Sequence, residues 1–223
     1  MPIEFLIAPY DAATRYSGPA RSLSSWRSLL KGKTAAELPR ESGAAIPPLV
    51  EHWTRTVYEK GAKPVVVGGD HSLTYSALCS AVSRFGSLSL VHFDAHHDAY
   101  PGGQLNHYTV FTWIKERLPV NVYGVGYRHD ASGVPDRLTE EVQGPTYISV
   151  DLDYFDPDLV TNVTHRVPGT GEYSLVTFEE SLQRIVGPVI GADILEWHGA
   201  QDGSREFRFV QQVQDRLIMR MNT

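Results

Sequence analysis

Apolar residues along the chain follow two different spacings, and the two spacings alternate. Short runs rich in β-branched residues predict buried strands at six places: residues 3–9, 63–72, 88–98, 120–129, 146–157 and 188–198. Between these runs, apolar positions three and four apart predict helices at residues 23–30, 47–61, 73–86, 107–118, 175–187 and 204–221. Outside its short helix, the polar stretch at residues 10–43 is predicted to be irregular.

The alternation of strands with helices indicates the fold class. Parallel strands need long crossover connections, which are usually helices, and these helices then cover both faces of the sheet. We therefore expect an α/β protein with three layers, α/β/α, around a mostly parallel central sheet. The length of 223 residues fits a single domain over residues 1–223. In such sheets, ligands bind beyond the carboxyl ends of the strands.

The composition narrows the class of protein. Hydrophobic residues make up 42% and charged residues 21%, which supports a packed core and argues against disorder. A formal net charge of −6 with no basic face argues against nucleic acid as a partner. The single cysteine, Cys79, suits a reducing compartment, so we expect a cytoplasmic protein. The first residues do not resemble a signal peptide, and no apolar stretch approaches the length of a membrane span.

Polar clusters directly follow the apolar runs. The segments "GGDHS", "DAHHD", "DLDYFDP" and "EWHG" begin at residues 68, 94, 151 and 196. Each comes at the expected carboxyl end of a strand, where ligands bind in a parallel sheet. Four strand ends that carry acids and imidazoles are more than a solvated loop requires.

Alternation along an extended chain predicts which side chains meet. Residues two apart point the same way, so Asp94, His96 and Asp98 are expected to share a face, as are Asp151 and Asp153. His71 is expected to join them from a third strand, after the Gly68-Gly69 turn.

Carboxylates gathered in this way repel one another unless cations neutralise them. Two divalent ions balance four carboxylates, which makes their burial tolerable. Oxygen-rich ligation with a few imidazoles suits Mn²⁺, and the lack of cysteine ligands disfavours a structural zinc site.

Each cluster taken alone has an ordinary structural explanation. A single Asp-x-Asp at a strand end is more often a helix cap or a solvated turn, and "GGDHS" could be a turn that leads into a helix capped by Ser72. Three such clusters after three core strands favour a functional site over these structural explanations. His97 is expected to point away from His96, and either packing or a supporting contact explains it.

The motifs also carry a family resemblance. "GGDHS", "DAHHD" and "SVDLDYFDP" resemble the three signature motifs of the arginase/agmatinase family, the ureohydrolases, in the family's order between Val65 and His198. The resemblance implies a three-layer α/β/α fold, a binuclear Mn²⁺ centre, and hydrolysis of a guanidino group to urea and an amine.

The resemblance also implies a set of metal ligands. One metal would be held by His71, Asp94, Asp98 and Asp151. The other would be held by Asp94, His96, Asp151 and Asp153, so that Asp94 and Asp151 bridge the pair.

Three catalytic roles follow from the same resemblance. "GGQLNHYTVF" resembles the family segment whose histidine shuttles protons or touches substrate, which implies His107. "ADILEW" resembles the segment whose glutamate pairs with the substrate guanidinium, which implies Glu196. Asp153 would accept a hydrogen bond from the nucleophile or carry its proton.

Departures from the family pattern concern the far end of the substrate. In free-arginine hydrolases, two asparagines and a serine commonly grip the α-amino and α-carboxylate groups, whereas the chain has Tyr100, Gly103 and Leu105 at these positions. The chain is also short for the family, and a longer segment after "DYFDP" carries His165 and Arg166. We therefore expect free arginine to be a poor substrate, with Tyr100 contacting a peptidyl arginine, which would become ornithine, or a modified arginine.

Three alternatives stay open at this point. The first is a hydrolase of free arginine or agmatine. The second is a single-zinc deacetylase-like amidohydrolase of the same fold, although the ligands Asp98 and His71 argue against it. The third is a non-catalytic relative, which would be expected to have lost a ligand, and none is lost here.

Overall fold

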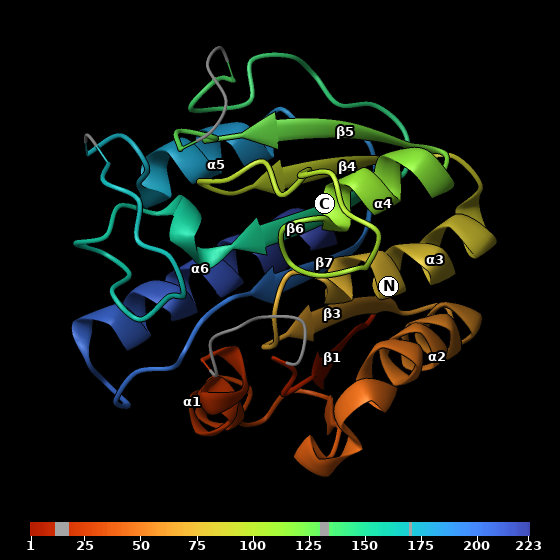
Figure 1. Cartoon of the computed structure of the whole chain (residues 1–223), viewed down its shortest axis with the longest axis horizontal. Coiled ribbons are helices and arrows are strands. Elements are labelled where there is room, and N and C mark those ends of the chain that lie inside the picture. Colours follow the sequence, from red (N-terminus) through yellow and green to blue (C-terminus); the bar gives the residue numbers. More distant parts are fainter. Residues whose placement is uncertain (12–17, 130–133, 170) are drawn as a thin grey trace.

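The protein is described here by a computed structural model that covers residues 1–11, 18–129, 134–169 and 171–223. Within these residues, one seven-stranded sheet has the order β2-β1-β3-β7-β6-β4-β5 (Figure 1). Every pair of neighbouring strands is parallel. The strands are β1 (Ile3–Ile7), β2 (Ala35–Glu37), β3 (Lys63–Val67), β4 (Leu88–Phe93), β5 (Val120–Val125), β6 (Thr146–Asp151) and β7 (Val189–Leu195).

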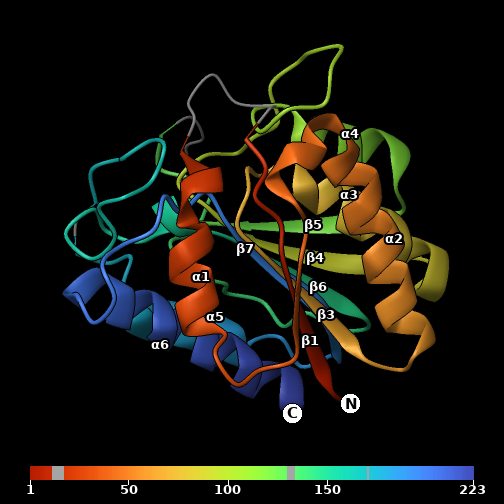
Figure 2. The same ribbon diagram turned by 90° about the horizontal axis from the view of Figure 1, so that it is seen from below.

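Helices cover both faces of the sheet, which confirms the predicted three-layer α/β/α class. The view along the sheet in Figure 2 shows the helices in two groups, one on each side. One layer contains α1 (Leu23–Leu29), α5 (Leu175–Gln183) and α6 (Arg205–Asn222). The other contains α2 (Ile46–Glu59), α3 (Leu73–Phe85) and α4 (Val110–Arg117). No helix in the described part of the chain is both long and apolar enough to cross a membrane.

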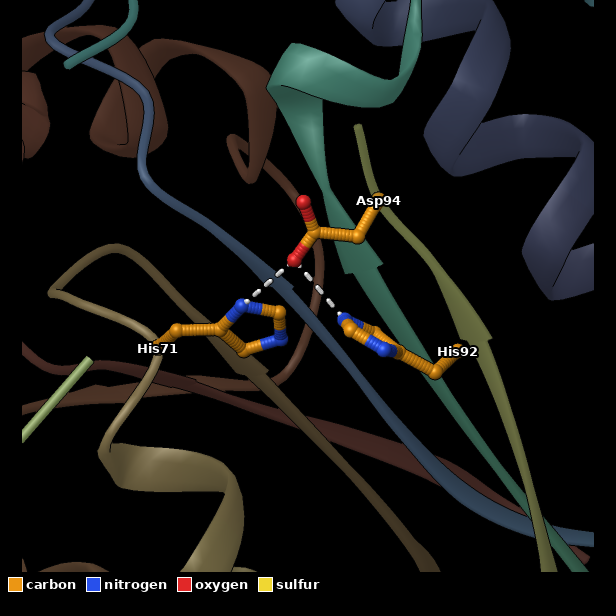
Figure 3. Close-up of side chains that lie close together, drawn as sticks. All are labelled: His71, His92 and Asp94. Atoms are coloured by element: carbon orange, nitrogen blue, oxygen red, sulfur yellow. Dashed lines mark hydrogen bonds and ion pairs between the residues drawn. The ribbon is translucent and has the colours of Figure 1, made fainter. Parts of the chain in front are cut away.

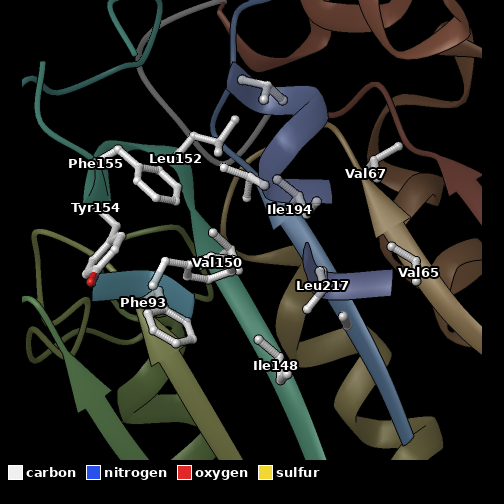
Figure 4. Close-up of a cluster of buried hydrophobic side chains, with 14 of the residues drawn as sticks. Val65, Val67, Phe93, Ile148, Val150, Leu152, Tyr154, Phe155, Ile194 and Leu217 are labelled. Atoms are coloured by element: carbon white, nitrogen blue, oxygen red, sulfur yellow. The ribbon is translucent and has the colours of Figure 1, made fainter. Parts of the chain in front are cut away.

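Two hydrophobic cores fill the spaces between the layers. Val65 and Val67 of β3 point into the core with α1, α5 and α6, together with Ile148 and Val150 of β6 (Figure 4). Val66, which lies between the two β3 valines, packs into the other core beside α2 and α3. Because alternate residues of a strand face opposite sides and both sides are covered, the central strands β3, β4, β6 and β7 are buried along their length and are mostly apolar.

The structure corrects the prediction for residues 10–43, of which residues 12–17 lie outside the described part: two 3-10 helices, Pro19–Ser22 and Arg40–Ala45, and one strand interrupt the irregular chain. Ala35–Glu37 forms the edge strand β2, which pairs with Phe5, Leu6 and Ile7 of β1. All three β2 residues are exposed, so the strand has no buried face. An edge strand without a buried face leaves no apolar alternation in the sequence, which explains why the pattern missed it.

The strands also end earlier than predicted. β3 ends at Val67, β4 at Phe93 and β6 at Asp151, so most of each polar motif lies in the turn that follows the strand. Helix α4 likewise begins at Val110 rather than at residue 107. The strands β3, β7, β6 and β4 are consecutive in the sheet, and their carboxyl ends bring the four polar turns to one edge.

Candidate metal centre

A glycine turn after β3 delivers His71 to the centre of this edge. Gly68 and Gly69 both have positive φ, at 77° and 86°. A Cβ on Gly69 would lie 2.5 Å from Leu73 Cδ1 and 2.8 Å from the carbonyl oxygen of Ala8. Only glycine suits such a position, since it has no Cβ and enters the left-handed region without strain.

The His71 imidazole meets three carboxylates from two other strand ends. Its Nδ1 lies 3.1 Å from Asp94 Oδ2, 3.1 Å from Asp98 Oδ2 and 3.5 Å from Asp151 Oδ2. All four side chains are buried, and their ligand atoms lie within 4.8 Å of one another. Asp98 reaches this position with a φ of 45°, which is uncommon outside glycine. The group contains the four residues expected for the first metal.

A second group of donors shares Asp94 with the first. His96 Nδ1 lies 2.9 Å from Asp153 Oδ2 and 3.4 Å from Asp94 Oδ1, and the donor atoms of these three residues lie within 4.8 Å of one another. Asp94 therefore turns one oxygen toward each group. Asp151, which was also expected here, does not belong to this second group by the same distance, so its bridging role stays a prediction.

Backbone N–H groups orient the carboxylates. The amide of Ala95 donates to Asp153 Oδ1 at 3.0 Å, and the amide of His96 donates to Asp94 Oδ1 at 2.6 Å. The amide of Asp153 donates to Asp151 Oδ1 at 2.8 Å. The turns after β4 and β6 thus fix each other. The donors converge through these turns, and not through the alternation along an extended strand that the sequence predicted.

Burial makes this concentration of charge costly. Desolvation, together with the neighbouring Asp94 charge, raises the pKa of Asp98 to about 7 and raises the pKa of Asp153. Desolvation and the charges of Asp153 and Asp94 raise the pKa of Asp151 well above its usual value. Burial acts in the same direction on Asp94, but the charge of His92 and the hydrogen bonds from its imidazole neighbours outweigh it, so the pKa of Asp94 is well below the ordinary value.

The donor set fits two divalent cations. Four carboxylates are buried together, and three of them have raised pKa values, so about four positive charges are needed for all four to ionise. The oxygen-rich donors and two imidazoles suit ions such as Mn²⁺. Among the described residues, these two donor groups could hold a metal pair, and a third group, His71, His92 and Asp94, overlaps the first.

Glu196 lies at the end of β7, beside the first donor group. Its Oε1 accepts the backbone N–H of His71 at 2.9 Å, and its Oε2 accepts the hydroxyl of Thr164 at 2.8 Å. Glu196 is buried and has a φ of 64°. Desolvation, with the nearby charge of Asp70, raises the pKa of Glu196 to about 8. Each carboxylate oxygen keeps a further lone pair for a cationic ligand.

The expected His107 lines the same inner space. A small void is lined by the side chains of His96, Asp98, His107, Tyr108, Asp151, Asp153, Thr164, His165 and Glu196. His107 is buried, and its ring centroid lies 3.7 Å from that of Tyr108. The void is therefore lined by residues of both donor groups and by two of the three residues expected to contact substrate, Glu196 and His107.

A larger cavity of about 880 Å³ lies next to this void and shares His96, Tyr108, Thr164 and His165 with it. Its lining includes Tyr100 and Gly103 from one loop and His165 and Arg166 from another. Tyr108 Oη lies 3.0 Å from His165 Nε2, and this contact joins the two loops. Leu105 was expected at the same surface, but it packs against the core beside α2 and α3 instead.

A sequence model of the arginase family matches the chain over residues 21–134 and 127–218. The chain belongs to the arginase family. The agmatinase of Chromobacterium violaceum is 30% identical in an alignment of 190 residues that covers 71% of this chain and 57% of the agmatinase. The proclavaminate amidinohydrolase of Streptomyces clavuligerus is 32% identical in an alignment of 169 residues that covers 59% of this chain and 53% of that protein.

The chain thus spans little more than half the length of these curated relatives. A solved arginase from Medicago truncatula covers the whole fold: it superposes with a TM-score of 0.80 over 99% of this chain and 87% of the other. At 18% identity, this likeness supports the shared fold alone.

In this member of the arginase family, His92 supports the centre from within a strand. Its Nε2 lies 2.8 Å from Asp94 Oδ2, on the same oxygen that His71 approaches (Figure 3). Its Nδ1 lies 2.6 Å from Tyr127 Oη, and its ring stacks on Phe111 at 3.8 Å. His92 was not predicted as a site residue, although a histidine two residues before Asp94 in an apolar run was an available signal.

A buried serine and aspartate support His71 from behind. His71 Nε2 lies 3.0 Å from Ser149 Oγ, and Ser149 donates to Asp193 Oδ1 at 2.6 Å. Because the serine proton goes to Asp193, its oxygen accepts from the imidazole, and Nδ1 is left facing the carboxylates. Burial raises the pKa of Asp193 to about 6. An aspartate inside the apolar run "GADIL" was the signal that could have found it.

Arg128 connects the inner centre to the outer cavity. Its guanidinium donates to the backbone carbonyls of Asp153 and Tyr154, both at 2.9 Å, and to that of Val167 at 3.2 Å. It also lies over the ring of Tyr173, 4.1 Å from the centroid. One side chain therefore fixes a donor-bearing turn and the loop that lines the outer cavity.

His97, whose role the sequence left open, belongs to neither donor group. Its Nδ1 accepts the backbone N–H of Ala99 at 2.9 Å, and its ring centroid lies 4.5 Å from that of Tyr100. This geometry supports a local role in shaping the loop after Asp98.

Proposed function

We propose that this protein hydrolyses a guanidino group to urea and an amine at a binuclear centre, for which Mn²⁺ is the most suitable ion. The observation that carries the proposal is the pair of donor groups that share Asp94, with Glu196 bonded to the His71 backbone beside them. Family membership supports the reaction class, since similar proteins are an agmatinase, an arginase and an amidinohydrolase.

The proposed ligands are those implied by the motifs. His71, Asp94, Asp98 and Asp151 would hold one ion, and Asp94, His96, Asp151 and Asp153 the other. Two bound divalent cations would supply a nucleophile at neutral pH by lowering the pKa of water.

Glu196 would bind the guanidinium of the substrate in the inner void. Its two oxygens are held by His71 and Thr164, so the carboxylate is oriented before the substrate arrives. Burial raises the pKa of Glu196 to about 8, and a guanidinium beside it would favour the ionised form. The resulting pair is a charge-assisted hydrogen bond.

Asp153 and His107 would handle protons on either side of the substrate. Asp153 lines the inner void, and its Oδ1 is held by the Ala95 amide, which leaves Oδ2 on the side of His96. Asp153 would accept a proton from the nucleophile. His107 lines the same void, and its imidazole would donate a proton to the departing amine as a general acid.

The proposed substrate is of the arginine type, with its α-amino and carboxyl ends blocked or altered. Tyr100 and Gly103 line the outer cavity where free-arginine hydrolases are expected to have polar groups. A peptidyl arginine and a modified arginine both fit this lining, and free arginine or agmatine is the alternative. We also propose that residues 1–223 act as one such hydrolase domain, and that the single Cys79 reflects a cytoplasmic location.

Urea release tests the reaction. Protein supplied with Mn²⁺ is incubated with arginine, agmatine, N-hydroxyarginine and an arginine-containing peptide under one set of conditions. We expect urea from at least one compound and none after the metal is chelated. Urea release from none of a broad guanidino panel would contradict the proposal.

A further inference from the structure

The charge of the lining differs between the inner void, which we call the floor, and the outer cavity, which we call the mouth. The inner void is lined by Asp98, Asp151, Asp153 and Glu196, with imidazoles between them. The outer cavity is lined by the basic or titratable side chains of His96, His129, His165 and Arg166, and its described lining contains no aspartate or glutamate. A molecule that enters guanidinium first would therefore leave its far end among basic and neutral groups.

Arg166 provides the permanent positive charge at this mouth. Arginine stays protonated at any ordinary pH, unlike the histidines beside it. Its side chain is exposed, and no described carboxylate forms an ion pair with it. The guanidinium of Arg166 can therefore bind an anion without first breaking an ion pair within the described structure.

The backbone of Arg166 is only two residues from a side chain that contacts the guanidinium site. Thr164 Oγ1 bonds to Glu196 Oε2 at 2.8 Å, which ties this segment to the guanidinium site. Arg166 follows two residues later, and two residues of extended chain span at most about 7 Å. A spacer of a few methylene groups, like that of arginine, covers a similar length.

We propose that the mouth selects guanidino compounds that carry a free carboxylate but no free ammonium group next to it. This inference rests on the proposed function and narrows the substrate class of the same site: the α-amino group is blocked or absent, but the carboxylate is free. Arg166 would pair with the carboxylate while Glu196 holds the guanidinium. An ammonium group would meet Arg166 with no carboxylate among the described lining residues to receive it. An ω-guanidino acid meets this requirement, and among peptidyl arginines the mouth would favour one at the carboxyl terminus, with its amino group acylated, over an internal one.

A matched pair of compounds isolates the carboxylate. N-acetylarginine carries it, whereas N-acetylargininamide differs only in having a neutral amide there. For the Mn²⁺-loaded protein we expect kcat/KM for urea release to be about three- to tenfold higher for the acid, as for a half-exposed charge pair. Agmatine, with an ammonium group at its far end, should be poorer than either.

Variants assign the preference to Arg166. Arg166→Gln should bring the ratio of acid to amide toward one, mainly through a higher KM for the acid, and Arg166→Glu should invert it and favour agmatine. The control is Arg55→Gln, which removes the same charge from the exposed surface of α2 and should keep the wild-type ratio.

The outcomes separate this inference from the proposed reaction. Equal turnover of acid and amide by the wild type, or an unchanged ratio in Arg166→Gln, would overturn the role of the mouth while the reaction stands. If no compound releases urea, the proposed reaction is wrong. Calorimetric measurement of the binding of N-acetylarginine and its amide then tests whether the mouth prefers a carboxylate. A Kd ratio of one would then overturn it, and tighter binding of the acid that is lost in Arg166→Gln would support it.

Discussion

The floor and the mouth of the cavity are built in different ways. The floor consists of buried donors in the turns after β3, β4 and β6, and backbone amides hold its carboxylates. The mouth consists of half-exposed side chains on two loops, which meet through the contact between Tyr108 and His165. The sheet therefore sets the positions of the donor side chains, and the loops shape the cavity through which a substrate would approach them.

The difference between floor and mouth has a physical cause. Neighbouring strands of a parallel sheet lie about 4.8 Å apart, so turns at their carboxyl ends hold side chains at metal-binding distances. Loops far from the sheet have no such support, and their shape depends on a few side-chain contacts. Changes at the floor should abolish the reaction, whereas changes at the mouth should alter the substrate.

The largest effect is expected from removing the shared donor. Asp94→Ala takes an oxygen from each group and leaves three imidazoles without their common partner. We expect kcat/KM for urea release to fall by at least about a thousandfold, and Mn²⁺ to lose most of its stabilising effect on the melting temperature. Asp158→Ala, an exposed aspartate that follows the third motif, is the control and should stay active. Normal turnover of Asp94→Ala would show that the floor is assigned to the wrong residues.

A smaller effect is expected from changing Glu196, the residue of the floor proposed to bind the substrate guanidinium. Glu196→Gln keeps the size of the side chain but removes the charge that would pair with the guanidinium. We expect kcat/KM to fall about ten- to a hundredfold, the usual cost of losing a hydrogen bond to a charged group. The metal content should stay at the wild-type level by elemental analysis, and Glu140→Gln on the surface serves as the control. Full activity in Glu196→Gln would place the guanidinium site elsewhere.

The smallest effect is expected at the residue that joins floor and mouth. Arg128→Lys keeps the charge but cannot reach the carbonyls of Asp153, Tyr154 and Val167 together, because an ammonium lacks the planar fork of a guanidinium. We expect kcat/KM to fall about tenfold, with a shift in the preference between N-acetylarginine and its amide. Arg137→Lys, in an exposed pair with Glu180, should change neither quantity. A loss of stability in Arg128→Lys without any change in substrate preference would show that Arg128 does not couple the floor to the mouth.

The sequence predicted much of the floor but little of the mouth. The donors of the floor lie in short motifs that directly follow apolar runs, so local pattern was enough to bring them together. The reason given was partly wrong, because β4 ends at Phe93 and Asp98 takes a left-handed conformation instead of continuing the strand.

Long-range contacts explain what the sequence could not supply. Tyr108 and His165 are 57 residues apart, and no local spacing indicates that they touch. Arg128 binds backbone carbonyls, which any sequence would offer. The edge strand β2 has no buried face and so leaves no pattern. His92 and Asp193 differ from these, because each is a polar residue inside a buried run and could have been found.

The number of metal ions per chain tests the central claim most directly. Purified protein is stripped of metal, reconstituted with Mn²⁺, freed of excess ion, and measured by elemental analysis against protein concentration. The two donor groups that share Asp94 predict a plateau at two ions per chain, and Asp94→Ala should lower it. A plateau at one ion would contradict the binuclear centre, with one tightly held zinc favouring the deacetylase-like alternative, and a plateau at zero would contradict a metal site altogether.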